Sequence, residues 1–150
     1  PVGSESNGKP QNRKDLASII ADHDVPYVGQ TTMIGNFSDL HKKAEKAIYT
    51  EGAAFLNIMT PCPRGWRYDT ADIMKICKLA VETCYWPMFE VEHGKWRLTY
   101  EPKKKLPIED FLREQGRFKH LFKPGNEDLI AQFQDEVDRR WEELQYKCAR

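Results

Sequence analysis

One cysteine stands out among the residues whose chemistry could serve a function. Cys62 lies between Pro61 and Pro63, in a turn that directly follows the apolar segment 53–60. If that segment is a strand, Cys62 sits at its carboxyl end, where open α/β sheets bind their ligands. The prolines restrict the backbone and remove amide donors, so a thiolate here would be held in a fixed direction. The alternative interpretation is a small buried hydrophobic residue, the usual state of a free cysteine.

The residues after Cys62 add charge and aromatic surface to the same turn. They supply two guanidinium groups and two aromatic rings: Arg64, Trp66, Arg67 and Tyr68. Such a set is able to clamp a carboxylate or a phosphate, or to dock a partner subunit. The alternative interpretation is that these four are ordinary surface residues that bind nothing.

The other candidate ligands have no spacing that predicts a site. Cys77 and Cys84 are seven residues apart on an expected helix, too distant for a disulfide, and both are predicted to be core residues. Cys148 is interpreted as an incidental thiol near the C-terminus. The four histidines are scattered without metal-ligand spacing, so no metal site built on them is predicted.

The segments that must position Cys62 alternate between helix and strand. Residues 15–23 have helical apolar spacing and lead into a β-branched strand at 25–32. The segment 53–60 is almost continuously apolar, which predicts a strand buried on both faces of a parallel sheet covered by helices. Between these strands a helix is predicted over 36–51, with Ser38 as its N-cap and an apolar face made by Leu40, Ala44, Ala47 and Ile48.

The remainder of the chain departs from simple α/β alternation. A helix is predicted to begin at Thr70, with Asp69 as its N-cap and an apolar stripe that continues to Cys84. The later predicted elements are a hairpin of strands 88–91 and 96–100 around a His93-Gly94 turn, a helix over 107–115 and a long helix over 127–147.

Length and composition exclude several classes of protein. The 150 residues fit one domain, 40% of them are apolar, and no apolar run approaches the roughly 18 residues of a membrane-spanning helix. Lys+Arg and Asp+Glu both number 23, so the net charge gives no general attraction to nucleic acid or to a membrane surface. The chain begins at Pro1 without a signal segment. We therefore expect part of a longer, cytoplasmic protein with reduced thiols.

Taken in order, several segments resemble one known family. They are similar to the thiamine-diphosphate-binding β-subunit of the multi-subunit pyruvate:ferredoxin oxidoreductases, within the wider 2-oxoacid:ferredoxin oxidoreductase family. The matching segments are 8–16, 25–28, 53–69, 79–83, 86–91 and 115–121. So many matches in the same order are far more specific than any single one.

The resemblance implies the C-terminal half of such a subunit. The expected fold is α/β, part of a thiamine-diphosphate-binding fold with a mostly parallel sheet between helices. An α/β core with a hairpin over 1–102 and a helical extension over 103–150 are expected. The implied enzyme oxidatively decarboxylates a 2-oxoacid, pyruvate by default, sends electrons through 4Fe-4S clusters to ferredoxin, and forms acyl-coenzyme A.

The resemblance also gives Cys62 a role. The cysteine of the family's Pro-Cys-Pro turn is the last ligand of the 4Fe-4S cluster beside the thiamine, so Cys62 is expected to be a metal ligand. The other cluster cysteines, and the motif that binds Mg²⁺ and the diphosphate, are expected upstream of Pro1. The chain alone is therefore expected to be inert. The opening residues 1–3, Thr31 and Thr32 are candidates for bordering the thiamine site.

Other functions remain open from the sequence. Relatives that act on oxalate or on branched-chain 2-oxoacids share much of the Cys62 turn. A different class is a non-catalytic module whose hairpin and long C-terminal helix dock a partner subunit. RNA binding is a weaker hypothesis, because acidic residues dilute the basic stretch 117–120 and the lysines 103–105.

Overall fold

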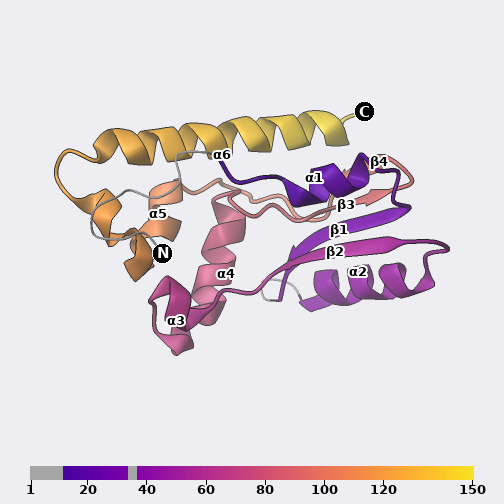
Figure 1. Cartoon of the computed structure of the whole chain (residues 1–150), viewed down its shortest axis with the longest axis horizontal. Coiled ribbons are helices and arrows are strands. Elements are labelled where there is room, and N and C mark those ends of the chain that lie inside the picture. The colour runs from indigo at the N-terminus through magenta and orange to yellow at the C-terminus, as the bar shows by residue number, and fades with distance from the viewer. Residues whose placement is uncertain (1–11, 34–36) are drawn as a thin grey trace.

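The structure is a computed structural model that describes residues 12–33 and 37–150. A four-stranded sheet lies at its centre, with helices on both sides and the long helix α6 along one of them (Figure 1). The elements in chain order are α1 (Leu16–Ala21), β1 (Tyr27–Thr32), α2 (Phe37–Tyr49), β2 (Ala54–Met59), α3 (Pro63–Trp66), the 3₁₀ helix η1 (Thr70–Asp72), α4 (Ile73–Glu82), β3 (Phe89–Glu92), β4 (Lys95–Leu98), α5 (Ile108–Arg113), the 3₁₀ helix η2 (Gly116–Phe122) and α6 (Glu127–Cys148).

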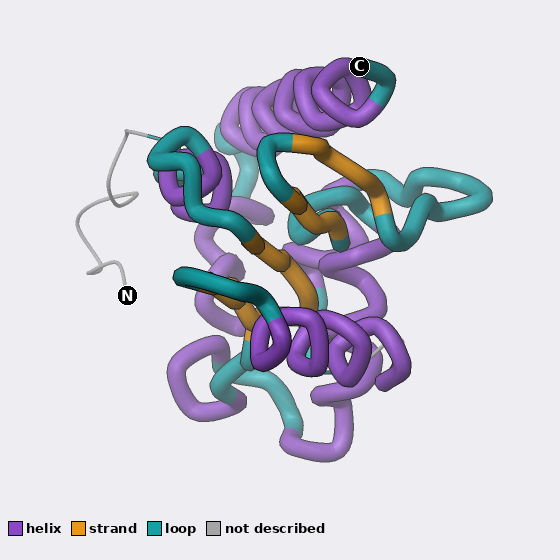
Figure 2. Tube along the Cα trace, turned by 90° about the vertical axis from the view of Figure 1, so that its right-hand side faces the viewer, coloured by secondary structure: helices purple, strands orange, loops and turns teal. Residues whose placement is uncertain are grey.

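The sheet is mixed, with the strand order β2-β1-β3-β4. Strands β1 and β2 are parallel, with Tyr27 opposite Ala54, which confirms the prediction of a parallel pair. Strand β3 runs antiparallel to both β1 and β4. The tube view places α2 and α6 on opposite sides of the strands (Figure 2). The sequence predicts a mostly parallel sheet, but two of the three strand pairings in the described residues are antiparallel, because the hairpin adds its strands beside β1.

The prediction that segment 53–60 is buried on both faces is wrong. Strand β2 is exposed or half-buried except at Met59, whereas β1 is buried throughout. The reason is position in the sheet: among the described residues β2 pairs only with β1 and forms an edge, while β1 has a neighbour on each side. Apolar composition alone did not distinguish the two strands.

Helix α2 buries its predicted face only in part: Leu40, Ala44 and Ala47 are half-buried, but Ile48 is exposed. Ser38 lies inside the helix rather than at its N-cap, and residues 34–36, where the predicted start falls, lie outside the described residues. Ile48 is 77% exposed, whereas Lys43 is only 1% exposed. A lysine takes the inward position because its ammonium group finds acceptors beneath the helix, as described below.

The predicted turn structures around α4 and the hairpin are confirmed, with one exception. The Asp69 side chain accepts a hydrogen bond from the backbone N–H of Ala71 at 2.9 Å, as an N-cap. His93 and Gly94 both have positive φ, the conformation of a type I′ hairpin turn. The exception is Cys84, which lies beyond the end of α4 with φ +58° and not on its apolar stripe.

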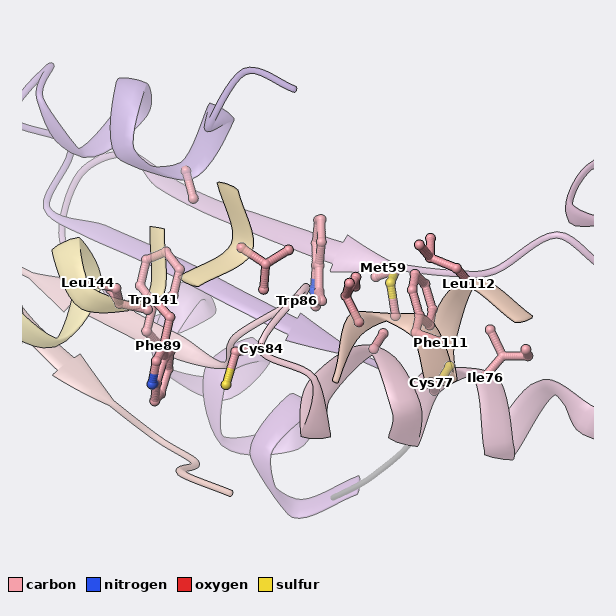
Figure 3. Close-up of a cluster of buried hydrophobic side chains, with 14 of the residues drawn as sticks. Met59, Ile76, Cys77, Cys84, Trp86, Phe89, Phe111, Leu112, Trp141 and Leu144 are labelled. Atoms are coloured by element: carbon pink, nitrogen blue, oxygen red, sulfur yellow. The ribbon is translucent and has the colours of Figure 1, made fainter. Parts of the chain in front are cut away.

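A single buried cluster joins the α/β part of the chain to the C-terminal helices. Side chains from β3, α4, α5 and α6 meet in it, with Trp141 and Leu144 of α6 near Phe89 of β3 (Figure 3). Phe89 also stacks on Trp96 across the hairpin, with ring centroids 5.4 Å apart. Helix α6 is therefore part of the core. No helix in the described ranges is long and apolar enough to cross a membrane.

Candidate functional site

The Cys62 turn lies at the carboxyl end of β2, as the sequence predicts. Cys62 is the N-cap residue of α3, with extended φ and ψ of −93° and 111°, and Pro63 is the first residue of that helix. The Cys62 carbonyl accepts a hydrogen bond from the Trp66 N–H at 2.9 Å, and the Pro63 carbonyl accepts one from the Arg67 N–H at 2.8 Å. The turn is thus closed by its own backbone, with Cys62 at its start.

Cys62 is the exposed member of the four cysteines. Cys77 and Cys84 are buried, which confirms their interpretation as core residues, and burial raises the pKa of the Cys84 thiol to about 12. Burial also raises the pKa values of the Cys77 and half-buried Cys148 thiols. A Cβ at Gly65 would lie 3.9 Å from the Cys62 Sγ, at ordinary van der Waals distance, so Gly65 lies beside the sulfur.

The aromatic residues of the turn serve its internal structure. The Trp66 ring meets the edge of Phe111, with centroids 6.2 Å apart, and carries the Arg117 guanidinium 3.7 Å from its centroid. The Tyr68 hydroxyl donates a hydrogen bond to the Pro61 carbonyl at 3.0 Å. Phe111 and Arg117 therefore already contact the Trp66 ring, and the Tyr68 hydroxyl is bonded within the turn. Arg64 and Arg67 remain exposed.

The two threonines at the end of β1 lie in the interior of the described fold. Thr31 and Thr32 are both fully buried. The Thr31 hydroxyl donates to Asp39 Oδ2 at 2.6 Å, and the Thr32 hydroxyl donates to the Met59 carbonyl at 3.1 Å. Both hydroxyls are committed to other parts of this chain. The other proposed border of the thiamine site, residues 1–3, lies outside the described residues.

Sequence reasoning missed a buried polar network beneath α2. The Lys43 Nζ donates to the Gln30 carbonyl at 2.8 Å, to Asp39 Oδ2 at 2.7 Å and to the Thr99 hydroxyl at 2.8 Å. Burial lowers the pKa of Lys43, and the Asp39 carboxylate only partly offsets this effect. The four-residue spacing of Asp39 and Lys43 was the available signal, but the same spacing is common on solvated helix faces.

A second missed group is Glu90 on β3. It is buried, accepts a hydrogen bond from the Tyr27 hydroxyl at 2.9 Å and from Lys46 Nζ at 2.9 Å, and pairs with Arg97. Burial alone would raise the pKa of Glu90, but these hydrogen bonds together hold it below its usual range. Glu90 and Lys43 are fully partnered, so we interpret both as structural.

The chemistry of the donor set fits one metal ligand and not a complete site. No cluster of three or more histidine, cysteine, aspartate or glutamate side chains in ranges 12–33 and 37–150 is arranged to hold a metal ion. Cys62 is an exposed sulfur on a backbone that prolines restrict. Thiolates are the usual ligands of iron–sulfur clusters. The described part of the chain can therefore supply one ligand to a shared cluster.

Comparison with known proteins finds subunits of oxidoreductases. The chain is 41% identical to pyruvate synthase subunit PorB of Thermotoga maritima over 145 residues, which is 96% of the chain and 44% of that protein. It is 42% identical to PorB of Methanosarcina barkeri over 139 residues, 92% of the chain and 47% of that protein. The resemblance to 2-oxoacid:ferredoxin oxidoreductase subunits is thereby confirmed.

The chain is also similar to a subunit that is not named PorB. The chain is also 38% identical to ketoisovalerate oxidoreductase subunit VorB of Pyrococcus furiosus, over 96% of the chain and 45% of that protein. No family model matches the chain. The chain spans about half the length of the curated relatives it matches.

Proposed function

We propose that the chain is part of a 2-oxoacid:ferredoxin oxidoreductase, active only within the complete multi-subunit complex. In this proposal the enzyme oxidatively decarboxylates pyruvate with thiamine diphosphate and Mg²⁺, transfers electrons through 4Fe-4S clusters to ferredoxin, and forms acyl-coenzyme A. The similarity to PorB subunits over nearly the whole chain carries the proposal. The α/β architecture is compatible with a segment of a thiamine-diphosphate-binding fold, and we assign the chain to its C-terminal half.

Within this function we assign Cys62 as one ligand of a 4Fe-4S cluster. The support is its exposure, its place at the end of β2 and the lack of other exposed thiols in the chain. The cluster would supply one-electron transfer, and the three other ligands would come from outside this chain. The chain itself orients the ligand, because Pro61, Pro63 and the backbone of α3 limit the directions in which the Cys62 sulfur can point.

The residues that hold thiamine diphosphate and Mg²⁺ are not assigned to this chain. Thr31 and Thr32 are unsuited to that role as they stand, because both hydroxyls already donate to acceptors inside the fold. The division into a core over 1–102 and an extension over 103–150 remains a proposal, although both parts share one buried cluster.

The substrate assay uses the full complex, purified without oxygen. Reduction of a viologen dye is measured in parallel with pyruvate and 2-oxoisovalerate in the presence of coenzyme A, and with oxalate in its absence, because oxalate is oxidised to CO2 and leaves no acyl group. We expect the highest rate with pyruvate, because several relatives are named pyruvate synthase subunits. The VorB relative makes a branched-chain 2-oxoacid the second candidate, and a dominant rate with 2-oxoisovalerate would replace pyruvate.

The ligand assignment is tested separately with Cys62→Ala in the same complex. Cys148→Ala is the matched control, because it removes a thiol that is not exposed. We expect Cys62→Ala to lower the iron content, to remove the electron paramagnetic resonance (EPR) signal of the cluster that Cys62 ligates, and to stop electron transfer. The control should retain all three. An unchanged spectrum in Cys62→Ala would contradict the assignment and favour a subunit-docking role.

A further inference from the structure

The Cys62 turn is fastened by a segment that lies far downstream in the chain. The Gly116 N–H donates a hydrogen bond to the Arg67 carbonyl at 2.9 Å. Arg67 ends α3 in the left-handed conformation, with φ 60° and ψ 61°, which is uncommon for a residue other than glycine. The first residue of η2 thus holds the last turn of α3 in a conformation that is unfavourable on its own.

Only glycine fits at position 116. A Cβ built there would lie 2.8 Å from the Arg67 Cβ and 2.9 Å from the Arg67 carbonyl oxygen. Real Cβ atoms do not approach backbone atoms so closely, so any side chain would push η2 away from α3. The absence of a side chain is therefore what allows the hydrogen bond between Gly116 and Arg67.

Arg117 provides a second attachment to the same turn. Its guanidinium lies over the Trp66 ring, 3.7 Å from the centroid, and 4.5 Å from the Phe118 centroid. Its Nε donates to Gln115 Oε1 at 2.8 Å, and the buried Gln115 donates in turn to the Phe111 carbonyl at 2.6 Å. The stack on Trp66 is therefore anchored to α5 as well as to η2.

The placement of Arg117 has a cost. Its Nη2 is buried and has no hydrogen-bond partner among the described residues. An unpaired buried donor is unfavourable, and such groups in a folded protein call for an explanation. The contact with Trp66 explains the unpaired donor, because it holds the Arg117 guanidinium where Nη2 has no acceptor.

We propose that Gly116 and Arg117 are positioning residues for Cys62. Both residues contact the C-terminal end of α3 and hold it in place. The prolines and the helix then direct the Cys62 sulfur outward. Neither Gly116 nor Arg117 is assigned to bind the cluster. The inference rests on the proposed function of Cys62 as a cluster ligand. It adds that the cluster's properties depend on the first two residues of η2, neither of which is a ligand.

The test compares Arg117→Lys with Arg113→Lys in the complete complex. Lysine keeps the charge but lacks the planar group that stacks on Trp66. Arg113 is the matched control, because its guanidinium also lies over a ring, 4.5 Å from the Phe122 centroid, but that ring is at the opposite end of η2 from Gly116 and Arg117. The readouts are the EPR g-values, the midpoint potential, the rate of iron release to a chelator, and the melting temperature (Tm).

We expect Arg117→Lys to shift the g-values and the midpoint potential and to release iron about fivefold faster, a change that fits the loss of one stacking contact. Arg113→Lys should match the wild type in all three cluster readouts. Gly116→Ala should change the cluster in the same direction and more strongly. If Gly116→Ala does not assemble, Arg117→Lys decides alone.

Two outcomes overturn the inference, and they are distinguishable. If Cys62→Ala loses the cluster signal but Arg117→Lys matches Arg113→Lys, the proposed function stands and the positioning role fails. A lowered Tm without a change in the cluster has the same meaning, because it shows a merely structural role. If Cys62→Ala keeps the signal, the ligand assignment and the positioning role fail together.

Discussion

Lys43 lies buried beside Asp39, with its Nζ 2.7 Å from Asp39 Oδ2. The two residues are one helical turn apart on α2, and both face the sheet rather than solvent. The pair ties α2 to the sheet, since Lys43 also bonds the carbonyl of Gln30 on β1.

Removal of one partner of this pair should destabilise the fold. Lys43→Met leaves the Asp39 carboxylate buried without its cation, and breaking a buried pair in this way costs about 3–5 kcal/mol. Thermal and urea unfolding of the complete subunit measure the loss. Lys42→Met, at the exposed neighbouring position, is the control and should change stability by less than about 0.5 kcal/mol. Equal effects of the two variants would contradict the interpretation of Lys43 as a structural anchor.

Glu90 should make stability depend on pH in the acidic range. Its pKa in the folded chain lies below the ordinary value of 4.5, so its contribution to stability is present above about pH 4.5 and is lost as the pH falls through the folded pKa. Glu90→Gln should therefore lose less stability on acidification than the wild type does, although it is less stable at pH 7. Urea unfolding from pH 7 to pH 3 tests this expectation. Glu142→Gln, at an exposed position, should retain the wild-type dependence.

The four thiols should differ in reactivity toward a maleimide. In cluster-free complete subunit at pH 7, Cys62 should react first because it is exposed, whereas Cys77 and Cys84 are buried with raised pKa values. Mass spectrometry of the labelled peptides gives the order. Protection of Cys62 in the cluster-loaded complex would support the ligand assignment, and rapid labelling of Cys77 would contradict the packing of α4.

Trp141 should contribute more to stability than any exposed residue of α6. It is buried in the shared core, so Trp141→Ala is expected to cost about 3–5 kcal/mol. Tyr146→Ala removes an exposed aromatic ring from the same helix and should cost far less. Chemical unfolding of the complete subunit compares the two, and similar losses would contradict the assignment of α6 to the core.

Local patterns predicted the elements well where neighbouring residues decide the structure. The Asp69 cap, the His93-Gly94 turn and the place of Cys62 after a strand depend on a few adjacent residues. The structure confirms all three. They follow from backbone preferences and from side chains that bond to their own turn.

The same local sequence patterns could not predict contacts between distant segments. The burial of Lys43 depends on acceptors from β1 and from Thr99, and the attachment of the Cys62 turn depends on Gly116. Nothing in the local spacing of these residues identifies the partner. The role of Trp66 was missed for the same reason, since its ring is covered by residues of α5 and η2.

Strand β2 has a practical consequence for producing the protein. Its six residues, Ala54 to Met59, include no charge and no proline, and one side of the strand is unpaired among the described residues. Exposed edges of this composition recruit further strands, and natural proteins usually protect them with charges or a covering segment. The chain expressed by itself is therefore expected to aggregate through β2, and whatever covers this edge in the complex acts as its solubilising partner.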